Sequence, residues 1–157
     1  MTSLLLVCTA NICRSPMAEA VFKAQAAALG LGRVASAGVR ASSRAQGMDP
    51  RAVQALARRR YAVEKKWRSR RVEPEDFLRF EHILAMDVDN LNALRRLCPP
   101  ELLHKLGLLL DLVPGRQGQE VPDPYFGSAR GFENVLDLIE LAAHSWVQAR
   151  PLGPRGP

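Results

Sequence analysis

The chain has 157 residues, of which 47% are hydrophobic and 24% charged, and its formal net charge at pH 7 is +6. This composition is typical of one globular domain with a substantial core, and no apolar run reaches the length of a membrane helix, which excludes a membrane-spanning class. The positive charge favours anionic partners, such as phosphate groups, acidic proteins or nucleic acid, without choosing among them.

The chain contains three cysteines: Cys8, Cys13 and Cys98. Their odd number and irregular spacing are typical of a reducing compartment, so we expect a cytoplasmic protein. The short apolar run Leu4–Val7 follows no basic segment, and we expect no secretory signal. We expect neither a metal nor a cofactor, because there is no CxxC pair and the histidines lie far apart on predicted core elements: His82, His104 and His144.

The first predicted element is a strand over Ser3–Val7, whose near-continuous apolar run is typical of a strand covered on both faces. Ser15 followed by Pro16 predicts the start of a helix, with proline at its first position. Gly30 and Gly32 predict the end of that helix.

A second strand is predicted over Val34–Val39, followed by a loop over Ala41–Met48. Asp49 and Pro50 have the cap-then-proline order that opens a helix. The basic stretch that follows, up to Arg71, is predicted to be a loop with a short strand. A short helix is predicted to begin within Glu73–Phe77.

The last part of the chain predicts two more strands, over His82–Met86 and Leu106–Leu112. Leucines at helical spacing predict a helix between them that ends at Cys98. A rigid loop over Val121–Gly127 contains two prolines. A long amphipathic helix is predicted over Phe132–Val147.

Strands that alternate with helices predict an α/β fold, in which a four-stranded parallel sheet has helices on both faces. We expect a single domain over residues 1–150 and a flexible tail over 151–157, which is rich in proline and glycine. In such sheets the functional site lies beyond the carboxyl ends of the strands. Cys8 directly follows the first strand, so a phosphate-binding loop is predicted there.

Cys8 and Arg14 bracket a tight loop that leads into a helix. Inward-pointing backbone N–H groups, the positive end of the helix dipole and a guanidinium all favour a thiolate, which is the nucleophilic form of cysteine. The same features bind a tetrahedral oxyanion, and a guanidinium can hold two of its oxygens. We therefore predict that Cys8 attacks a phosphoryl group that Arg14 binds. The residues predicted to shape this loop and bind phosphate are Thr9, Ala10, Asn11, Ile12, Cys13 and Ser15.

Two of these residues have specific expected roles. Asn11 tolerates left-handed backbone geometry and can form hydrogen bonds across the loop. Ser15 can cap the helix, or it can donate its hydroxyl to the sulfur of Cys8 when that sulfur is a leaving group. The alternative for Cys8 itself is an inert buried cysteine at a strand end.

The segment VCTANICRSPMAEAVF, residues 7–22, strongly resembles the signature of low-molecular-weight protein tyrosine phosphatases. The resemblance continues in the same order through five further segments: SAG (36–38), MDPRA (48–52), ILAMD (83–87), NL (90–91) and DPYF (123–126). It implies hydrolysis of phosphotyrosine in proteins or peptides, and of small aryl phosphates, through a cysteinyl-phosphate intermediate. We also expect a monomer, although the sequence itself does not reveal the oligomeric state.

The resemblance assigns Asp123 as the general acid that protonates the leaving oxygen and then as the base for the attacking water. The alternative is an ordinary Asp-Pro turn. Tyr125 and Phe126 are candidates for an aromatic wall beside the substrate ring, and the alternative for Phe126 is plain packing. Cys13 adjoins Arg14 in the same tight loop as Cys8. The resemblance implies a reversible disulfide between Cys8 and Cys13. The alternative is that Cys13 is a small buried side chain.

The chain departs from the family pattern at two places. The loop that contains Ser42 and Ser43, which are candidates for the substrate wall, lacks the aromatic residues found there in the family, so a more open and more basic wall is expected. Trp67 lies near the place of a family histidine that supports the phosphate loop through the serine of SAG, here Ser36. If that support is missing, we expect a less tightly held loop.

The sequence leaves three alternative functions to consider. A phosphoarginine phosphatase on this fold is disfavoured because Ile12 and Tyr125 are of the tyrosine-phosphatase type. An arsenate reductase needs two further cysteines in a mobile segment, and the chain has only Cys98. A basic nucleic-acid-binding domain that uses residues 58–71 has no recognition motif in its favour, so no nucleic-acid partner is expected.

Overall fold

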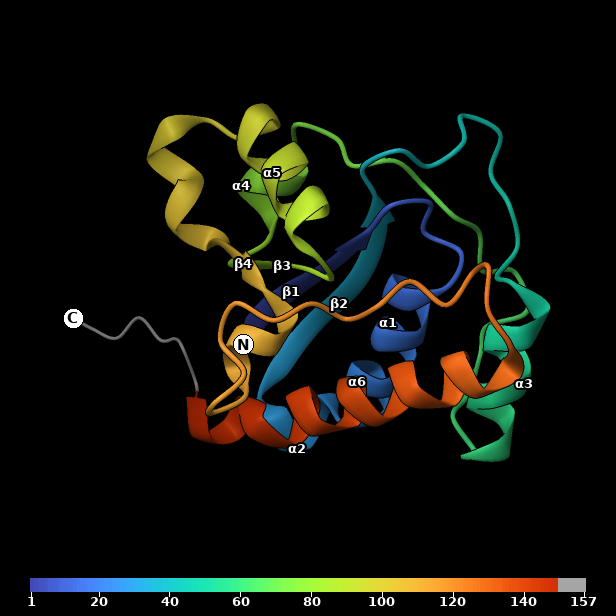
Figure 1. The fold of residues 1–157 in the computed structure, drawn as a ribbon. Coiled ribbons are helices and arrows are strands. Elements are labelled where there is room, and N and C mark those ends of the chain that lie inside the picture. The colour runs from blue at the N-terminus through green and yellow to red at the C-terminus, as the bar shows by residue number, and fades with distance from the viewer. Residues whose placement is uncertain (150–157) are drawn as a thin grey trace.

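A four-stranded parallel sheet forms the centre of the protein within residues 1–149, the part of the chain that the computed structural model describes (Figure 1). The four parallel strands confirm the predicted sheet, and they lie in the order β2-β1-β3-β4. Their bounds are β1 (Thr2–Cys8), β2 (Leu31–Gly38), β3 (His82–Ala85) and β4 (Leu106–Leu108). Side chains are described up to residue 146, and the predicted tail at 151–157 lies outside the described residues.

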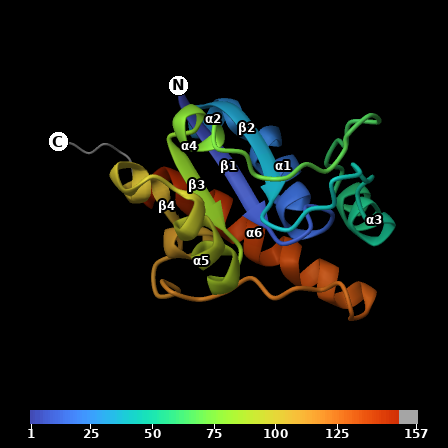
Figure 2. The same ribbon diagram turned by 90° about the horizontal axis from the view of Figure 1, so that it is seen from above.

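Helices cover both faces of the sheet, which confirms the prediction (Figures 1 and 2). One face is covered by α1 (Arg14–Ala24), α2 (Ala26–Leu29), α3 (Pro50–Arg58) and α6 (Ala129–Ala149). The other face is covered by α4 (Asp76–Arg79) and α5 (Val88–Leu97). Two short 3₁₀ turns flank β4, and they are η1 (Pro100–Lys105) and η2 (Leu109–Leu112).

Strand β1 is apolar throughout because both of its faces are buried. Leu4 and Leu6 pack in the core on the side of α1 and α6, whereas Leu5 and Val7 pack on the side of α5. β1 pairs with β2 on one edge and with β3 on the other. The central strand is therefore fixed on all sides, and it holds Cys8 at the carboxyl end of the sheet.

The first helix differs from the prediction in its bounds. α1 begins at Arg14 rather than Ser15, and its cap residue is Cys13, which makes no side-chain cap bond. The Ser15 hydroxyl instead contacts Cys8 Sγ. The helical run breaks at Gln25, and α2 ends at Gly30, whose φ of 71° is the left-handed conformation that glycine favours. Gly32 lies inside β2 and not at the helix end.

The predicted strand over Leu106–Leu112 is wrong in its second half. β4 ends at Leu108, and the next four residues form η2. Asp111 accepts a hydrogen bond from the Leu108 N–H through Oδ2 at 3.0 Å, and from the Gly118 N–H through Oδ1 at 2.8 Å. A local side-chain acceptor therefore takes the donor that a longer strand would have used.

The remaining elements follow the prediction with small shifts. Asp49 caps α3 by accepting the Arg51 N–H at 2.8 Å, with Pro50 as the first residue of the helix. The strand predicted within the basic stretch is reduced to one bridge between Gly38 and Arg71. In the described residues no helix is both long and apolar enough to span a membrane.

Candidate active site

The loop between β1 and α1 turns its carbonyl groups outward and its N–H groups inward. The carbonyls of Cys8, Thr9 and Ile12 accept from Val39, Arg40 and Asp49, which belong to the following loop; the distances are 3.0, 2.9 and 2.9 Å. The N–H groups of residues 9–14 donate to no backbone or side-chain acceptor among the described residues. Consecutive free N–H groups at a helix N-terminus form a concave site for an anion.

Asn11 sets the shape of this loop. It is fully buried and has a φ of 60°, a left-handed conformation that asparagine tolerates better than most residues. Its amide nitrogen donates to Ser15 Oγ at 2.8 Å and to Ser36 Oγ at 3.0 Å. Its carbonyl oxygen accepts the Arg70 N–H at 2.9 Å. One side chain thus ties the loop to α1, β2 and the segment before α4.

Cys8 lies at the floor of the site, 3% exposed, with its Sγ 3.0 Å from Ser15 Oγ. Asn11 donates one amide hydrogen to Ser15, so the Ser15 oxygen is already an acceptor. The hydroxyl hydrogen of Ser15 is then free for the sulfur at 3.0 Å, or for the more distant Ala37 carbonyl at 3.4 Å. Ser15 therefore contacts the sulfur of Cys8 and does not cap α1.

The hydrogen bonds that run from Cys8 through Ser15, Asn11 and Ser36 end at a buried carboxylate. Glu19 Oε1 accepts from Ser36 Oγ at 2.5 Å and from Trp67 Nε1 at 3.1 Å, and Lys23 pairs with Oε2 at 2.8 Å. Because the carboxylate can only accept, Ser36 must donate to Glu19 and accept from Asn11. The support of Ser36 is therefore not missing, since Glu19 holds Ser36 and the Trp67 indole binds Glu19.

Arg14 is buried with 2% exposure and is fixed along one edge of its guanidinium. Nη1 donates to Asp87 Oδ2 at 2.8 Å and to the Val121 carbonyl at 2.9 Å. Nη2 makes a longer contact of 3.4 Å with Thr9 Oγ1. Nε has no partner among the described residues, so Nε and Nη2 are available for two oxygens of an anion.

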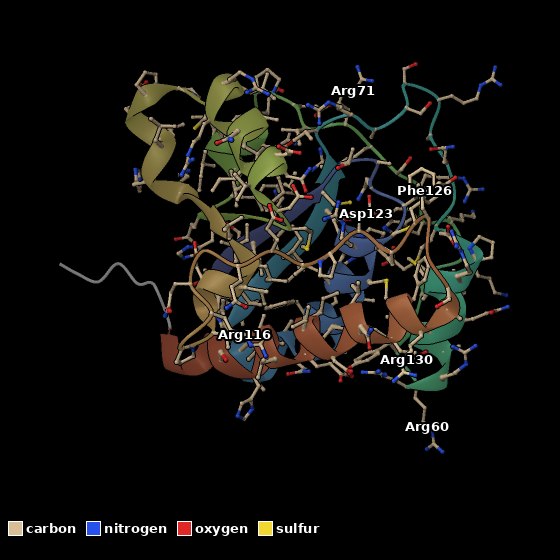
Figure 3. The ribbon with its side chains drawn as sticks, viewed as in Figure 1. Arg60, Arg71, Arg116, Asp123, Phe126 and Arg130 are labelled. Atoms are coloured by element: carbon tan, nitrogen blue, oxygen red, sulfur yellow. The ribbon has the colours of Figure 1, made fainter. Side chains whose placement is uncertain are left out.

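Asp123 lies at the mouth of the same site, on the loop that precedes α6 (Figure 3). Its side chain is 48% exposed, and Oδ2 lies 3.7 Å from Arg14 Nη2. Oδ1 accepts the Tyr125 N–H at 3.1 Å, an Asx-type turn that fixes the carboxyl relative to its own loop. One carboxyl oxygen is thus held by the loop, and the other faces the guanidinium.

A second arginine fastens that loop to α3. Arg51 Nη2 donates to the Tyr125 carbonyl at 3.0 Å, and Nη1 donates to the Gly127 carbonyl at 3.3 Å. The same guanidinium pairs with Asp49 Oδ2 at 2.9 Å and lies 4.6 Å from the centre of the Phe132 ring. The loop of Asp123 is therefore held from α3, a long way off in sequence.

These residues enclose a pocket of about 290 Å³. The pocket is lined by Cys8, Thr9, Ala10, Ile12, Cys13, Arg14, Gln46, Asp123 and Tyr125. The structure therefore brings the predicted nucleophile, phosphate-binding arginine and acid together in one cavity. Asn11 and Ser15 lie behind the loop, where they support it.

The predicted substrate wall is only partly formed by the residues expected. Tyr125 lines the pocket and is 42% exposed, while Phe126 is 94% exposed and stacks edge-on against Tyr125 with ring centres 4.9 Å apart. Phe126 is therefore not packed in the core. Ser42 and Ser43 do not line this pocket but a separate cavity, and Gln46 lines the catalytic pocket instead.

The two other cysteines differ from Cys8. Burial, the nearby Asp49 and Cys8 raise the pKa of the Cys13 thiol to about 12. Cys98 lies in the core on the opposite face of the sheet, with the α5 side chains, and burial raises the pKa of its thiol. All three cysteines are free thiols in the structure. Among the described residues, no group of three or more His, Cys, Asp or Glu is placed to hold a metal ion.

Several residues of the site were not singled out from the sequence. Asp87 is the last residue of the segment ILAMD and has no role assigned from the sequence, yet it orients Arg14 and caps α5 by accepting the Asn90 N–H at 2.8 Å. Arg51 and Glu19 lie within segments that carry the resemblance, but their roles are not visible locally because each binds residues distant in sequence. The position of Asp87 just after a buried strand is a hint of its role, since side chains at strand ends gather at the site.

Comparisons with known proteins show which proteins this chain is similar to. A sequence model of the family described as low molecular weight phosphotyrosine protein phosphatase matches residues 3–151. The chain is 41% identical over 149 residues to a low molecular weight protein-tyrosine-phosphatase of Streptomyces coelicolor, across 91% of this chain and 90% of the other.

Solved structures have the same fold. A protein tyrosine phosphatase from Entamoeba histolytica, with Hepes in its active site, has a TM-score of 0.84 and 35% identity, over 95% of this chain and 96% of the other. A mutant of the YwlE arginine phosphatase with a phosphorylated active-site serine has a TM-score of 0.84 and 30% identity, over 96% of this chain and 97% of the other.

Proposed function

Because the chain belongs to the low molecular weight phosphotyrosine protein phosphatase family, we propose that it hydrolyses phosphotyrosine in proteins or peptides through a cysteinyl-phosphate formed on Cys8. The observation that carries this proposal is the position of Cys8 Sγ beneath a ring of free loop N–H groups, with the Arg14 guanidinium at their edge. A dianionic phosphate placed in that ring is held by the groups that also favour a thiolate.

In the first step the Cys8 thiolate attacks phosphorus, and an S–P bond forms as the P–O bond to the tyrosine oxygen breaks. Arg14 Nε and Nη2 hold two of the non-bridging oxygens, and the loop N–H groups hold the charge that develops on them. Asp123, in its protonated form, gives its proton to the departing phenolate oxygen. Its place at the mouth, facing Arg14 at 3.7 Å, is consistent with a leaving group directed outward.

In the second step a water molecule attacks phosphorus and the S–P bond breaks, which releases inorganic phosphate. Asp123, now a carboxylate, accepts a proton from that water. The sulfur leaves as a thiolate, and the Ser15 hydroxyl at 3.0 Å donates a hydrogen bond to it. The Asn11, Ser36 and Glu19 chain keeps Ser15 oriented as a donor.

The pocket wall favours an aromatic phosphate over phosphoarginine. Ile12 and Tyr125 both line the pocket and offer apolar surface to a flat ring. The likeness to an arginine phosphatase makes phosphoarginine the specific alternative. Arsenate reduction is disfavoured, because the only other cysteine outside the loop, Cys98, lies on the opposite face of the sheet.

The test is a hydrolysis assay on matched peptides that carry phosphotyrosine, phosphoserine or phosphoarginine. We expect phosphotyrosine to have the highest kcat/KM, and Cys8→Ser to abolish turnover while retaining affinity for inorganic phosphate or vanadate. Turnover in Cys8→Ser would remove Cys8 as the nucleophile. A profile led by phosphoarginine would replace the substrate but retain the chemistry.

A further inference from the structure

Two basic loops lie directly against the phosphate loop, and the proposed mechanism uses none of their cations. The first covers residues 39–48 and the second residues 64–71, and they run beside each other between β2 and α4 (Figure 1). The Arg40 N–H donates to the Thr9 carbonyl at 2.9 Å, and the Arg70 N–H donates to Asn11 Oδ1 at 2.9 Å. Gln46 and Ser69 join the two loops through bonds of 2.8 and 2.9 Å.

The two basic loops carry six exposed cations: Arg40, Arg44, Lys65, Lys66, Arg68 and Arg71. None of them forms an ion pair with a carboxylate of the described residues, whereas Arg70, the seventh cation of the basic loops, pairs with Asp76. Glu64, the one carboxylate within the basic loops, lies 3.5 Å from Lys23. The surface beside the pocket therefore has uncompensated positive charge, which attracts an acidic partner.

A cavity of about 480 Å³ lies between the basic loops. It is lined by Ser42, Ser43, Ala45 and residues 69–74, and Glu73 is the single carboxylate among them. Arg71 borders it and is braced by bonds from Nε and Nη2 to the Ala41 carbonyl. Gln46, next to Ala45, lines the catalytic pocket. The two cavities thus adjoin across residues 45–46.

This adjacency indicates what the basic loops bind. A phosphotyrosine in the catalytic pocket places the rest of its peptide at the pocket mouth, where the neighbouring surface is cationic. Nucleic-acid surfaces of this kind combine cations with exposed aromatic rings for stacking. The only aromatic residue of the basic loops is Trp67, which is half-buried and donates its indole N–H to Glu19. An acidic peptide matches the surface better than a nucleic acid does.

We propose that the basic loops form a docking surface for acidic residues that flank the phosphotyrosine of a protein substrate. This proposal rests on the proposed function and adds a preference among its substrates. Each exposed charge contact is weak and is screened by salt, so the preference should be electrostatic in character and should arise from several cations together.

The test compares two phosphotyrosine peptides that differ only in flanking Glu or Gln residues. We expect the wild-type enzyme to have a roughly tenfold higher kcat/KM for the Glu peptide at low ionic strength, and the difference to disappear near about 0.5 M salt. The triple variant Arg40→Gln, Arg44→Gln, Arg68→Gln should lose this preference. The matched control is Arg60→Gln, Arg116→Gln, Arg130→Gln, whose side chains project away from Arg71 (Figure 3).

Hydrolysis of p-nitrophenyl phosphate, which has no flanking residues, separates the two proposals. If the wild-type enzyme fails to hydrolyse it, the proposed function is wrong. If all three proteins hydrolyse it equally but no peptide preference exists, only the docking surface is wrong. An equal loss in the control variant would also overturn the proposal, because net charge would then explain the preference.

A folding defect in the triple variant would lower its turnover of p-nitrophenyl phosphate. In that case the single variant Arg44→Gln replaces it. We expect Arg44→Gln to reduce the preference for the Glu peptide over the Gln peptide by roughly two- to threefold. Tight binding of a single-stranded oligonucleotide that depends on these cations, with no peptide preference, would assign the basic loops to nucleic acid instead.

Discussion

Arg51 donates to the Tyr125 carbonyl at 3.0 Å and so joins the beginning of α3 to the loop that carries Asp123. The Tyr125 N–H in turn donates to Asp123 Oδ1 at 3.1 Å. The position of the proposed acid thus depends on a residue that never contacts the substrate oxygen. Arg51 is therefore a positioning residue. Replacing it should lower kcat in the same way as replacing Asp123 does, but to a smaller extent.

Replacing Asp123 by Asn should slow the enzyme most on substrates with poor leaving groups. An amide cannot supply a proton to the departing oxygen, and general-acid catalysis typically contributes about 10² to 10⁴-fold. The measurement is kcat for a series of aryl phosphates of increasing leaving-group pKa. A steeper decline with leaving-group pKa than in the wild type is expected, and a uniform decline across the series would remove Asp123 as the acid.

Replacing Arg51 by Ala should lower kcat roughly three- to thirtyfold for poor leaving groups and less for good ones, because misplacing a catalytic group costs rate without removing it. The matched control is Arg58→Ala at the other end of α3, which pairs with Glu133 and makes no bond to the acid loop. A loss that is independent of the leaving group would mean that Arg51 supports the fold in general and not Asp123.

The sequence predicts well those parts of the site that are local. The buried strand, Cys8, the five-residue loop and Arg14 lie within one continuous stretch, so their chemistry is visible without tertiary structure. The alternation of strands and helices also leads directly to the parallel sheet. The left-handed φ of Asn11 is a local property of that residue type.

Other parts depend on contacts that no local pattern encodes. Arg14 binds the Val121 carbonyl, a backbone group that carries no side-chain signal. Arg51 reaches Tyr125 across 74 positions of sequence. The residues after Leu108 are as apolar as a strand, yet they form a turn in which Asp111 accepts the Leu108 N–H. An apolar run indicates burial but does not distinguish a strand from a buried turn.

Cys13 should be dispensable for turnover, in contrast to Cys8. Its pKa of about 12 keeps it a neutral thiol at working pH, so it does not compete as a nucleophile. We expect Cys13→Ser to keep kcat on p-nitrophenyl phosphate within about threefold of the wild type. Loss of activity as complete as in Cys8→Ser would contradict this assignment.

The raised pKa of the Cys13 thiol also predicts how the stability of the protein depends on pH. The Cys13 pKa is raised above its ordinary 9.0, so the unfolded chain releases this proton at lower pH than the folded protein does. The contribution to the free energy of unfolding is complete below about pH 9 and declines as pH rises toward 12. Between about pH 8.5 and 10.5 the wild type should lose about 1–2 kcal/mol more than Cys13→Ser, measured by urea unfolding. Equal losses would show that Cys13 ionises normally in the folded protein.

Glu19 should matter more to catalysis than Trp67, although both belong to the chain of bonds that ends at Cys8. Glu19→Ala leaves the Ser36 hydroxyl and the Trp67 indole without an acceptor, and each unsatisfied buried donor costs about 1–3 kcal/mol. The Ser36 hydroxyl can then rotate its hydrogen toward Asn11, which disturbs the orientation of the Asn11 amide. We expect kcat to decrease by roughly tenfold or more, with part of the loss recovered in Glu19→Gln, which keeps an acceptor oxygen.

Trp67→Phe is the matched variant, because it removes one donor to Glu19 and leaves the Ser36 bond at 2.5 Å and the Lys23 pair intact. It should lower stability by about 1 kcal/mol and keep kcat within about threefold of the wild type. The measurements are kcat and the inhibition constant of inorganic phosphate, together with urea unfolding of each variant. If Trp67→Phe lowered kcat as far as Glu19→Ala, the indole would be the true support of the phosphate loop, and the carboxylate would only connect the indole to Ser36.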